Sequence, residues 1–284
     1  MKILLAGCGQ LGLQLGQQLQ ASGDEFMGVT RTDSPTPFPF LLADLSDSNA
    51  LAHQPPDYDV IVFSVTPSDR TDTAYRHVYT DVLSNIVAFA KCHSTPPLII
   101  FTSSTSVYGQ QNGQWVDENS LTEPTHFSGK WVLYGEKYLQ QHWDNHLIVR
   151  FSGIYGEHRR GLIDYAIGGK PIQKTPTVWT NRIHEADCIG SLLFLINRYR
   201  CGTDNNKPLE KCYLVSDNQP IGRYEVCAFI CQLLGQPLTP IADDNLTDNL
   251  NKRCDNSKII SLGYRFIYPT FQAGYRSVLK KPIA

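Results

Sequence analysis

The chain has 284 residues, of which 42% are hydrophobic and 18% charged, and its formal net charge is −2 at pH 7. This composition is typical of a globular protein with one large or two smaller domains, and the weak negative charge argues against a nucleic-acid partner. No apolar stretch approaches the roughly 18 residues of a membrane span, and the N-terminal apolar run is too short for a signal peptide. We therefore expect a cytoplasmic protein with no nucleic-acid and no membrane partner.

The eight cysteines contain no Cys-x-x-Cys pair, and the histidines follow no metal-ligand spacing. Scattered cysteines of this kind are typical of reduced, mostly buried thiols. We therefore expect neither disulfides nor a metal site.

The first predicted elements are a strand at residues 2–6, a glycine-rich turn at residues 7–12 (GCGQLG) and a helix. A GxGxxG pattern in this context is typical of a dinucleotide site. Gly7 permits the tight turn, Gly9 lets the backbone approach a pyrophosphate, and Gly12 lets helix and strand pack closely. The helix start adds free N–H groups for the phosphates. The alternative is an ordinary glycine-rich loop. The predicted cofactor contacts here are Gly7, Gly9, Gln10, Leu11 and Gly12.

Strands and helices continue to alternate as far as residue 152, which predicts an α/β, Rossmann-type, doubly wound parallel sheet. In such sheets the ligand lies beyond the carboxyl ends of the strands. Thr30, Asp44, Thr66 and Ser104 should therefore share one crevice, and Ser64 and Val65 join them as predicted cofactor contacts. The predicted strands are residues 25–30, 40–45, 57–65, 98–101 and 147–150, and the predicted helices are residues 72–92 and 131–143.

The pattern becomes irregular after residue 152. We predict helices at residues 186–199 and 223–234, a short strand at 213–215, and a loop or frayed helix at 243–256. The expected domains are therefore a dinucleotide-binding domain at residues 1–152 and a smaller mixed substrate lobe at residues 153–284. Segments around residues 182–200 are expected to return to the first domain.

Five segments in this order resemble the extended short-chain dehydrogenase/reductases, also called the NAD-dependent epimerase/dehydratase family. The resemblance spans nearly the whole chain and implies a nicotinamide cofactor and a small-molecule substrate. It also implies that Ser104 is a catalytic serine that hydrogen-bonds the reacting oxygen, whereas its alternative role is a local backbone hydrogen bond. The matching segments are residues 101–109 (FTSSTSVYG), 116–118 (VDE) with Pro124, 150–156 (RFSGIYG), 182–187 (RIHEAD) and 255–264 (DNSKIISLGY).

The chain departs from this family at the catalytic Tyr-x-x-x-Lys pair, in which the lysine lowers the pKa of the tyrosine. When the helix is aligned on Glu136, Ser128 takes the tyrosine position and Val132 the lysine position. His126 and Lys130 have the required spacing, but only after a two-residue slip. The segment resembles an atypical subgroup that lacks the usual pair.

The residues that follow the second strand favour NADP over NAD as the cofactor. NAD-binding chains usually have a carboxylate about 20 residues beyond the glycines, where this chain has Thr30 and Arg31 and no carboxylate before Asp33. An arginine there can pair with the 2′-phosphate of NADP, although a solvated strand-end charge is the alternative. Asp44 and Leu45 resemble the segment that binds the adenine edge of either cofactor.

These observations predict an NAD(P)-dependent, epimerase/dehydratase-like oxidoreductase with atypical acid/base residues. Its substrate is expected to be a small carbonyl compound or a nucleotide sugar. The alternative is an NAD(P)-binding sensor or scaffold without catalysis. A homodimer is also possible through the helices at residues 72–92 and 131–143, as the resemblance implies, although core packing explains their apolar residues equally well.

Overall fold

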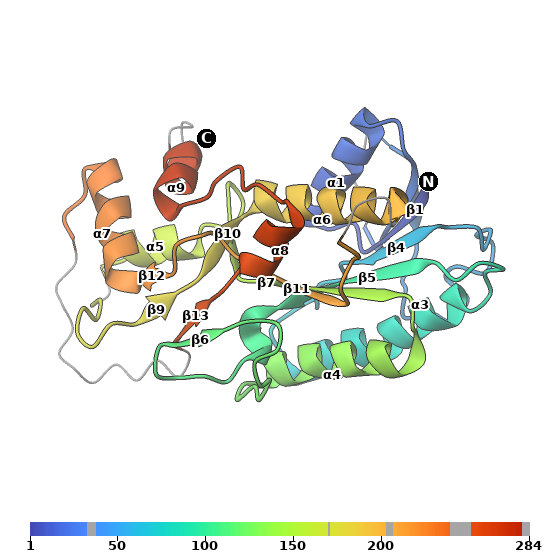
Figure 1. Cartoon of the computed structure of the whole chain (residues 1–284), viewed down its shortest axis with the longest axis horizontal. Coiled ribbons are helices and arrows are strands. Elements are labelled where there is room, and N and C mark those ends of the chain that lie inside the picture. Colours follow the sequence, from blue (N-terminus) through green and yellow to red (C-terminus); the bar gives the residue numbers. More distant parts are fainter. Residues whose placement is uncertain (33–37, 170, 203–206, 239–250, 280–284) are drawn as a thin grey trace. The chain divides into compact units, whose positions relative to one another are not determined.

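The computed structural model describes residues 1–32, 38–169, 171–202, 207–238 and 251–279 (Figure 1). The chain divides into two compact units. Tyr108–Glu123 belongs to unit 2, although the sequence analysis placed it in the first domain. Unit 1 consists of Met1–Val107, Pro124–Arg150 and Leu192–Tyr213, and unit 2 consists of Tyr108–Glu123, Phe151–Ser191 and Leu214–Ala284.

The centre of unit 1 is a seven-stranded sheet in the order β11-β7-β5-β4-β1-β2-β3. Strands β3, β2, β1, β4 and β5 pair in parallel, so their carboxyl ends lie at one edge. All four residues of β4 are buried, as expected for a parallel strand covered on both faces. The strands are β1 (Lys2–Ala6), β2 (Glu25–Thr30), β3 (Phe40–Leu42), β4 (Val60–Phe63), β5 (Leu98–Ser104), β7 (His146–Phe151) and β11 (Cys212–Val215).

Helices cover both faces of this sheet, which confirms the doubly wound Rossmann-type fold (Figure 1). On one face lie α1 (Gln10–Ala21) and the Leu192–Arg200 part of α6 (Glu185–Arg200), and on the other lie α3 (Leu83–Ala90) and α4 (Phe127–His142). The predicted helix at residues 72–92 is composite, because a π-helical turn at Val78–Val82 joins α2 (Asp72–His77) to α3. Helix α4 begins before the predicted residue 131.

Unit 2 contains three two-stranded sheets, short helices and a core of its own. Strand β13 lies within residues 243–256, which were predicted as a loop or frayed helix, and residues 243–250 of that segment lie outside the described part of the chain. The strand pairs are β6 (Gln114–Val116) with β13 (Lys252–Cys254), β8 (Gly153–Tyr155) with β10 (Arg182–His184), and β9 (Trp179–Thr180) with β12 (Ile221–Gly222). The helices are α5 (Gly161–Ile167), α7 (Arg223–Leu234), α8 (Ser257–Leu262) and α9 (Phe271–Leu279).

The described residues contain neither a membrane-spanning helix nor a cluster of metal ligands. No helix among them is both long and apolar enough to cross a membrane. No group of three or more His, Cys, Asp or Glu side chains among them could hold a metal ion.

Candidate cofactor site

The glycine loop joins β1 to α1, and the surrounding backbone itself requires two of its glycines. Gly7 has a φ of +97°, and a Cβ there would lie 2.7 Å from the backbone nitrogen of Val65. A Cβ at Gly12 would lie 2.6 Å from the carbonyl oxygen of Gly7. Both distances are too short for non-bonded atoms, so a side chain at either position would push the loop away from β4 or from α1.

Gly9 differs from both, because a Cβ there would meet no protein atom within 4 Å. It is the exposed N-cap residue of α1 and has extended backbone angles (φ −72°, ψ −166°). No side chain caps this end, and the first turn of α1 contains no acidic residue. The N–H groups at the start of α1 are therefore available to an anion, and the space at Gly9 is a cradle that a side chain would fill. This arrangement fits a pyrophosphate.

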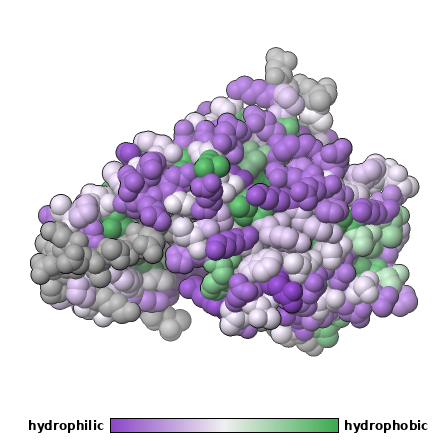
Figure 2. Space-filling view, turned by 90° about the horizontal axis from the view of Figure 1, so that it is seen from below, coloured by the Kyte–Doolittle hydropathy of each residue, from purple (hydrophilic) through white to green (hydrophobic). Residues whose placement is uncertain are grey.

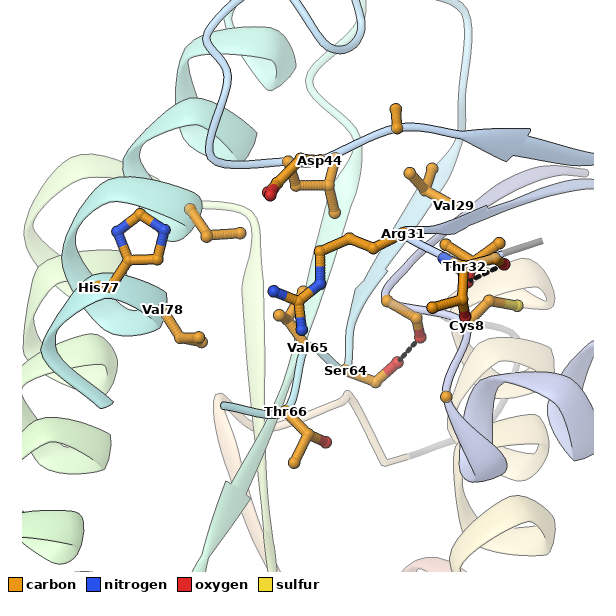
Figure 3. Close-up of a pocket in the computed structure, with 16 residues that line it drawn as sticks. Cys8, Val29, Arg31, Thr32, Asp44, Ser64, Val65, Thr66, His77 and Val78 are labelled. Atoms are coloured by element: carbon orange, nitrogen blue, oxygen red, sulfur yellow. Dashed lines mark hydrogen bonds between the residues drawn. The ribbon is translucent and has the colours of Figure 1, made fainter. Parts of the chain in front are cut away.

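A pocket opens at the carboxyl ends of β1, β2 and β4, beside the glycine loop (Figure 3). It brings together most of the residues that the sequence predicted as cofactor contacts. Gln10, Leu11 and Gly12 do not line it and instead form the first turn of α1. The predicted residues in the lining are Gly7, Gly9, Thr30, Arg31, Asp44, Leu45, Ser64, Val65 and Thr66.

Hydrogen bonds within the chain hold two of these strand ends in place. The hydroxyl of Ser64 donates to the carbonyl oxygen of Gly7 at 2.7 Å, which ties the glycine loop to the end of β4. The hydroxyl of Thr30 donates to the carbonyl oxygen of Thr32 at 3.1 Å. Both side chains shape the pocket wall through these bonds.

Arg31 follows β2 directly, and its guanidinium group extends into the pocket (Figure 3). It forms no ion pair with any residue in the described part of the chain. Asp44 lies on the same rim, and the Ser46 N–H that donates to its Oδ1 at 2.9 Å holds its pKa below the ordinary value, with smaller contributions from the charges of Arg31 and His77. The rim therefore combines one carboxylate with one exposed guanidinium. Asp33 lies outside the described residues.

A further part of the pocket lining was not predicted from the sequence. Val78, Val82 and His77 come from α2 and the π-helical turn, and no motif marks them. A π-helical turn shifts the following side chains around the helix axis and is often found at functional sites. The missed lining residues are Cys8, Val29, Thr32, Ala43, His77, Val78 and Val82.

Ser104, the predicted catalytic serine, is half-buried at the end of β5. Its Oγ accepts a hydrogen bond from the backbone N–H of Ser106 at 3.1 Å, which is the local role that the sequence analysis gave as the alternative. A hydroxyl that accepts through its oxygen keeps its own proton for another acceptor. Both roles are therefore compatible with this geometry.

A buried ion pair holds α4 in place. This is the helix on which the Tyr-x-x-x-Lys positions of the family were aligned. Glu136 on α4 accepts hydrogen bonds from Arg150 on β7, from Nε at 2.9 Å and from Nη2 at 2.7 Å, and a further one from the hydroxyl of Ser103. The side chains of Arg150 and Glu136 are only 7% and 1% exposed. One turn back along α4 from Glu136, Val132 is buried in the core, whereas Ser128 is half-buried.

His126 and Lys130, the alternative acid/base pair, are not held by buried hydrogen bonds like those of Glu136. His126 is the exposed N-cap residue of α4 and its side chain makes no capping hydrogen bond, and Lys130 is exposed in the first turn. The expected absence of a Tyr-x-x-x-Lys pair and the role of Ser104 stay predictions.

In unit 2, the RIHEAD segment serves internal packing. Arg182 forms a buried ion pair with Asp217, with 3.6 Å between Nη1 and Oδ2, and burial raises the pKa of Asp217 to about 7. Asp187 accepts hydrogen bonds from the hydroxyl of Tyr264 and from the N–H groups of Ile267 and Tyr268. These contacts tie β10 and the start of α6 to the segment before α9.

A glycine loop, a parallel sheet with the observed strand order and a pocket at its carboxyl edge define a dinucleotide-binding protein of the extended short-chain dehydrogenase/reductase class. A family model described as the RmlD substrate binding domain matches residues 1–167, and the chain belongs to that family.

Three individual proteins show how far the similarity extends. The chain is 27% identical to the protein YeeZ of Escherichia coli K12, over 94% of this chain and 96% of YeeZ. It is 30% identical to a Methylobacillus flagellatus protein provisionally assigned as an NAD-dependent epimerase/dehydratase, with a TM-score of 0.82 and coverage of 98% and 97%. UDP-glucuronic acid 4-epimerase from Bacillus cereus in complex with NAD shares the fold, with a TM-score of 0.76, 22% identity and 99% coverage of both chains.

Proposed function

We propose that the chain binds NADP(H) in the glycine-loop pocket and prefers it to NAD(H). The observation that carries this proposal is Arg31, which follows β2 directly and extends its guanidinium group into the pocket. An NAD-selective site would have a carboxylate at this position to bind the ribose 2′-hydroxyl. A guanidinium group instead matches a phosphate with two parallel N–H donors.

Other groups of unit 1 account for the rest of such a ligand. The N-terminus of α1 and the open space at Gly9 suit the pyrophosphate. Asp44 and Leu45 line the same pocket and would contact the adenine edge. Gln10, Leu11 and Gly12 would contribute through the backbone of the first helical turn.

We further propose an enzyme of the epimerase/dehydratase type that acts on a small carbonyl compound or a nucleotide sugar in the cytoplasm. The cofactor would supply hydride exchange when bound. The free proton of the Ser104 hydroxyl would hydrogen-bond the reacting oxygen of the substrate and polarise it. Acid/base work falls to groups other than a Tyr-x-x-x-Lys pair, because α4 has Ser128 and Val132 at the aligned positions.

Calorimetric titration with NADPH and NADH tests the cofactor proposal, with Arg31→Ala and Arg31→Lys beside the wild type. Loss of charged hydrogen bonds worth about 1.5–3 kcal/mol should weaken NADPH binding by Arg31→Ala roughly 10- to 100-fold. NADH binding should change less than about twofold, because its 2′-hydroxyl offers no charge to pair. Arg31→Lys should lie between the two, since it keeps the charge without the paired donors. Equal losses for both cofactors would refute the preference.

The second candidate function is an NADP(H)-binding sensor or scaffold without catalysis, which the apolar Val132 at the aligned lysine position favours. NADPH oxidation with a panel of carbonyl compounds and nucleotide sugars separates the two. Saturable turnover that Ser104→Ala lowers at least about 100-fold in kcat, with unchanged NADPH affinity, supports the enzyme. Tight NADPH binding without turnover of any compound supports the sensor.

A further inference from the structure

His77 lines the cofactor pocket from a part of the chain that no sequence motif marks. It is the last residue of α2, and its imidazole lies on the opposite side of the pocket from Arg31 (Figure 3). Asp44 belongs to the lining of the same pocket. His77 and Asp44 therefore face the same pocket.

The hydrogen bond of His77 to its own helix determines which ring nitrogen can accept. Nδ1 lies 2.8 Å from Oδ2 of Asp81, one turn further along. This contact and the hydroxyl of Thr80, which donates to Oδ1 at 2.9 Å, lower the pKa of Asp81 and keep it a carboxylate. A carboxylate can only accept, so the proton of the neutral imidazole lies on Nδ1. Nε2 then has a free lone pair, and in Figure 3 the ring nitrogen on that side points toward the pocket.

We propose that His77 is a base-selecting residue of the cofactor site, whose Nε2 accepts a hydrogen bond from the exocyclic amine of adenine. The inference rests on the proposed function, because it concerns the same dinucleotide. An adenine N6 amine has two N–H donors, and the pocket offers two acceptors on one side, the Asp44 carboxylate and His77 Nε2. Each donor of the amine can then have an acceptor of its own.

The arrangement selects against a purine with an oxygen at position 6. Hypoxanthine and guanine have a carbonyl there, so the acceptors of the protein would face an acceptor of the base, and the hydrogen bonds to the amine would be lost. The discriminating groups thus come from two elements, the loop after β3 and the end of α2. The phosphate-binding Arg31 takes no part in this choice.

The test compares NADPH with its hypoxanthine analogue, deamino-NADPH, by calorimetry on the full chain. The wild type should bind the analogue roughly tenfold more weakly than NADPH, the effect of one or two unmatched hydrogen bonds. His77→Phe keeps an aromatic ring on the wall but has no acceptor. It should weaken NADPH and reduce the ratio between the two ligands by about threefold or more, while the affinity for deamino-NADPH changes little.

Two controls separate this role from a structural one. His53→Ala removes an exposed histidine of unit 1 that does not line the pocket, and both affinities should stay at the wild-type value. His77→Ala removes the ring as well as the acceptor and should lower the same ratio even if both ligands bind more weakly.

The outcomes distinguish the two proposals. Tight NADPH binding with equal affinity for deamino-NADPH, or a ratio unchanged in both His77 variants, refutes the role of His77 and leaves the NADP(H) site intact. Failure of the wild type to bind either dinucleotide refutes the proposed function and the inference with it. A ratio that falls in both variants and not in His53→Ala supports the inference.

Discussion

Two neighbouring regions of unit 1 differ in what their motif residues do: one is open to a ligand and the other is bonded within the protein. At the carboxyl ends of β1, β2 and β4, the glycine loop is complete and its central glycine faces open space. At β5 and α4, by contrast, Ser103 and Arg150 both bind the buried Glu136, so these polar groups hold the protein together. The residues that would hold a dinucleotide and those that would transfer a proton therefore lie on different elements of one sheet, and either set can change without the other.

Substitution of Glu136 tests whether the β5–α4 region is structural, and it should have a greater effect on stability than the other changes below. Glu136→Ala leaves Arg150 buried without its partner, and removal of one member of a buried pair typically costs about 3–5 kcal/mol. Urea unfolding followed by circular dichroism should show that loss. Glu136→Gln keeps hydrogen bonds but not the charge and should cost less.

Lys137→Ala is the matched control, because Lys137 is the exposed neighbour of Glu136 on α4. A surface change of this kind should alter the unfolding free energy by less than about 0.5 kcal/mol. If Glu136→Ala were no more destabilising than the control, the pair would not hold β7 and α4 together.

The glycine loop offers an internal comparison between two alanine substitutions. Gly12→Ala would place a Cβ 2.6 Å from the carbonyl oxygen of Gly7, and an overlap of this kind typically costs about 1–3 kcal/mol. Gly9→Ala meets no protein atom within 4 Å and should leave stability nearly unchanged. It should instead lower NADPH affinity by about tenfold or more, because the methyl group fills the pyrophosphate cradle.

Thermal melts and calorimetry on the two alanine variants check this pair. A stable Gly9→Ala variant with wild-type NADPH affinity would show that the open space is not where the ligand lies. A fully stable Gly12→Ala variant would show that α1 can move away from the loop.

The sequence predicts the close packing at Gly12 well, because it depends on local backbone geometry that a short motif encodes, whereas the role of Gly9 at a pyrophosphate stays a prediction. The ends of β2 and α7 follow from local signals in the same way: β2 stops at Thr30, and Gly235 closes α7 with a φ of +62°. The predicted helix at residues 131–143 begins earlier, at Phe127, and includes Gly129, where a Cβ would lie only 2.3 Å from the carbonyl oxygen of Ser106. Glycine in that helix is a packing requirement and not a break.

Other parts of the site could not be found from the sequence. His77 contributes to the pocket only because α2 passes beside the end of β3, and its neighbours along the chain give no hint of that contact. The π-helical turn at Val78–Val82 has no marker in its residues either. Glu136 was used to align the helix, but its pairing with Arg150 depends on the packing of α4 against the sheet. Long-range contacts of this kind are outside the reach of local patterns.

Unit 2 offers a pH-dependent test, since burial raises the pKa of Asp217 to about 7. A carboxyl group with a raised pKa in the folded state contributes stability at low pH, and this contribution is lost as the pH rises through the folded-state pKa. Between pH 6 and pH 8 the wild type should lose about 1.4 kcal/mol through this group. Asp217→Asn cannot ionise, so its unfolding free energy should be flatter over the same range.

Urea midpoints at several pH values measure this difference between the wild type and Asp217→Asn. Equal pH slopes for the two proteins would show that the ion pair with Arg182 keeps Asp217 ionised throughout. Asp47→Asn changes an exposed carboxylate of unit 1 and serves as the control with the wild-type slope.

The smallest effect on stability is expected on the outer face of α4, where the homodimer stays a prediction. Figure 2 looks onto the face that carries α3 and α4, and its most hydrophobic residues are scattered among polar ones. Phe127 and Tyr134 on α4 are 38% and 44% exposed, and the ring of Trp131 packs edge-on against Tyr134.

If this face joins two copies, Tyr134→Glu places two charges in the interface and should convert dimer to monomer. Sedimentation velocity at several concentrations would show that shift, while the unfolding free energy of the monomer changes by less than about 0.5 kcal/mol. A monomeric wild type would remove the dimer prediction and leave the aromatic face as ordinary surface.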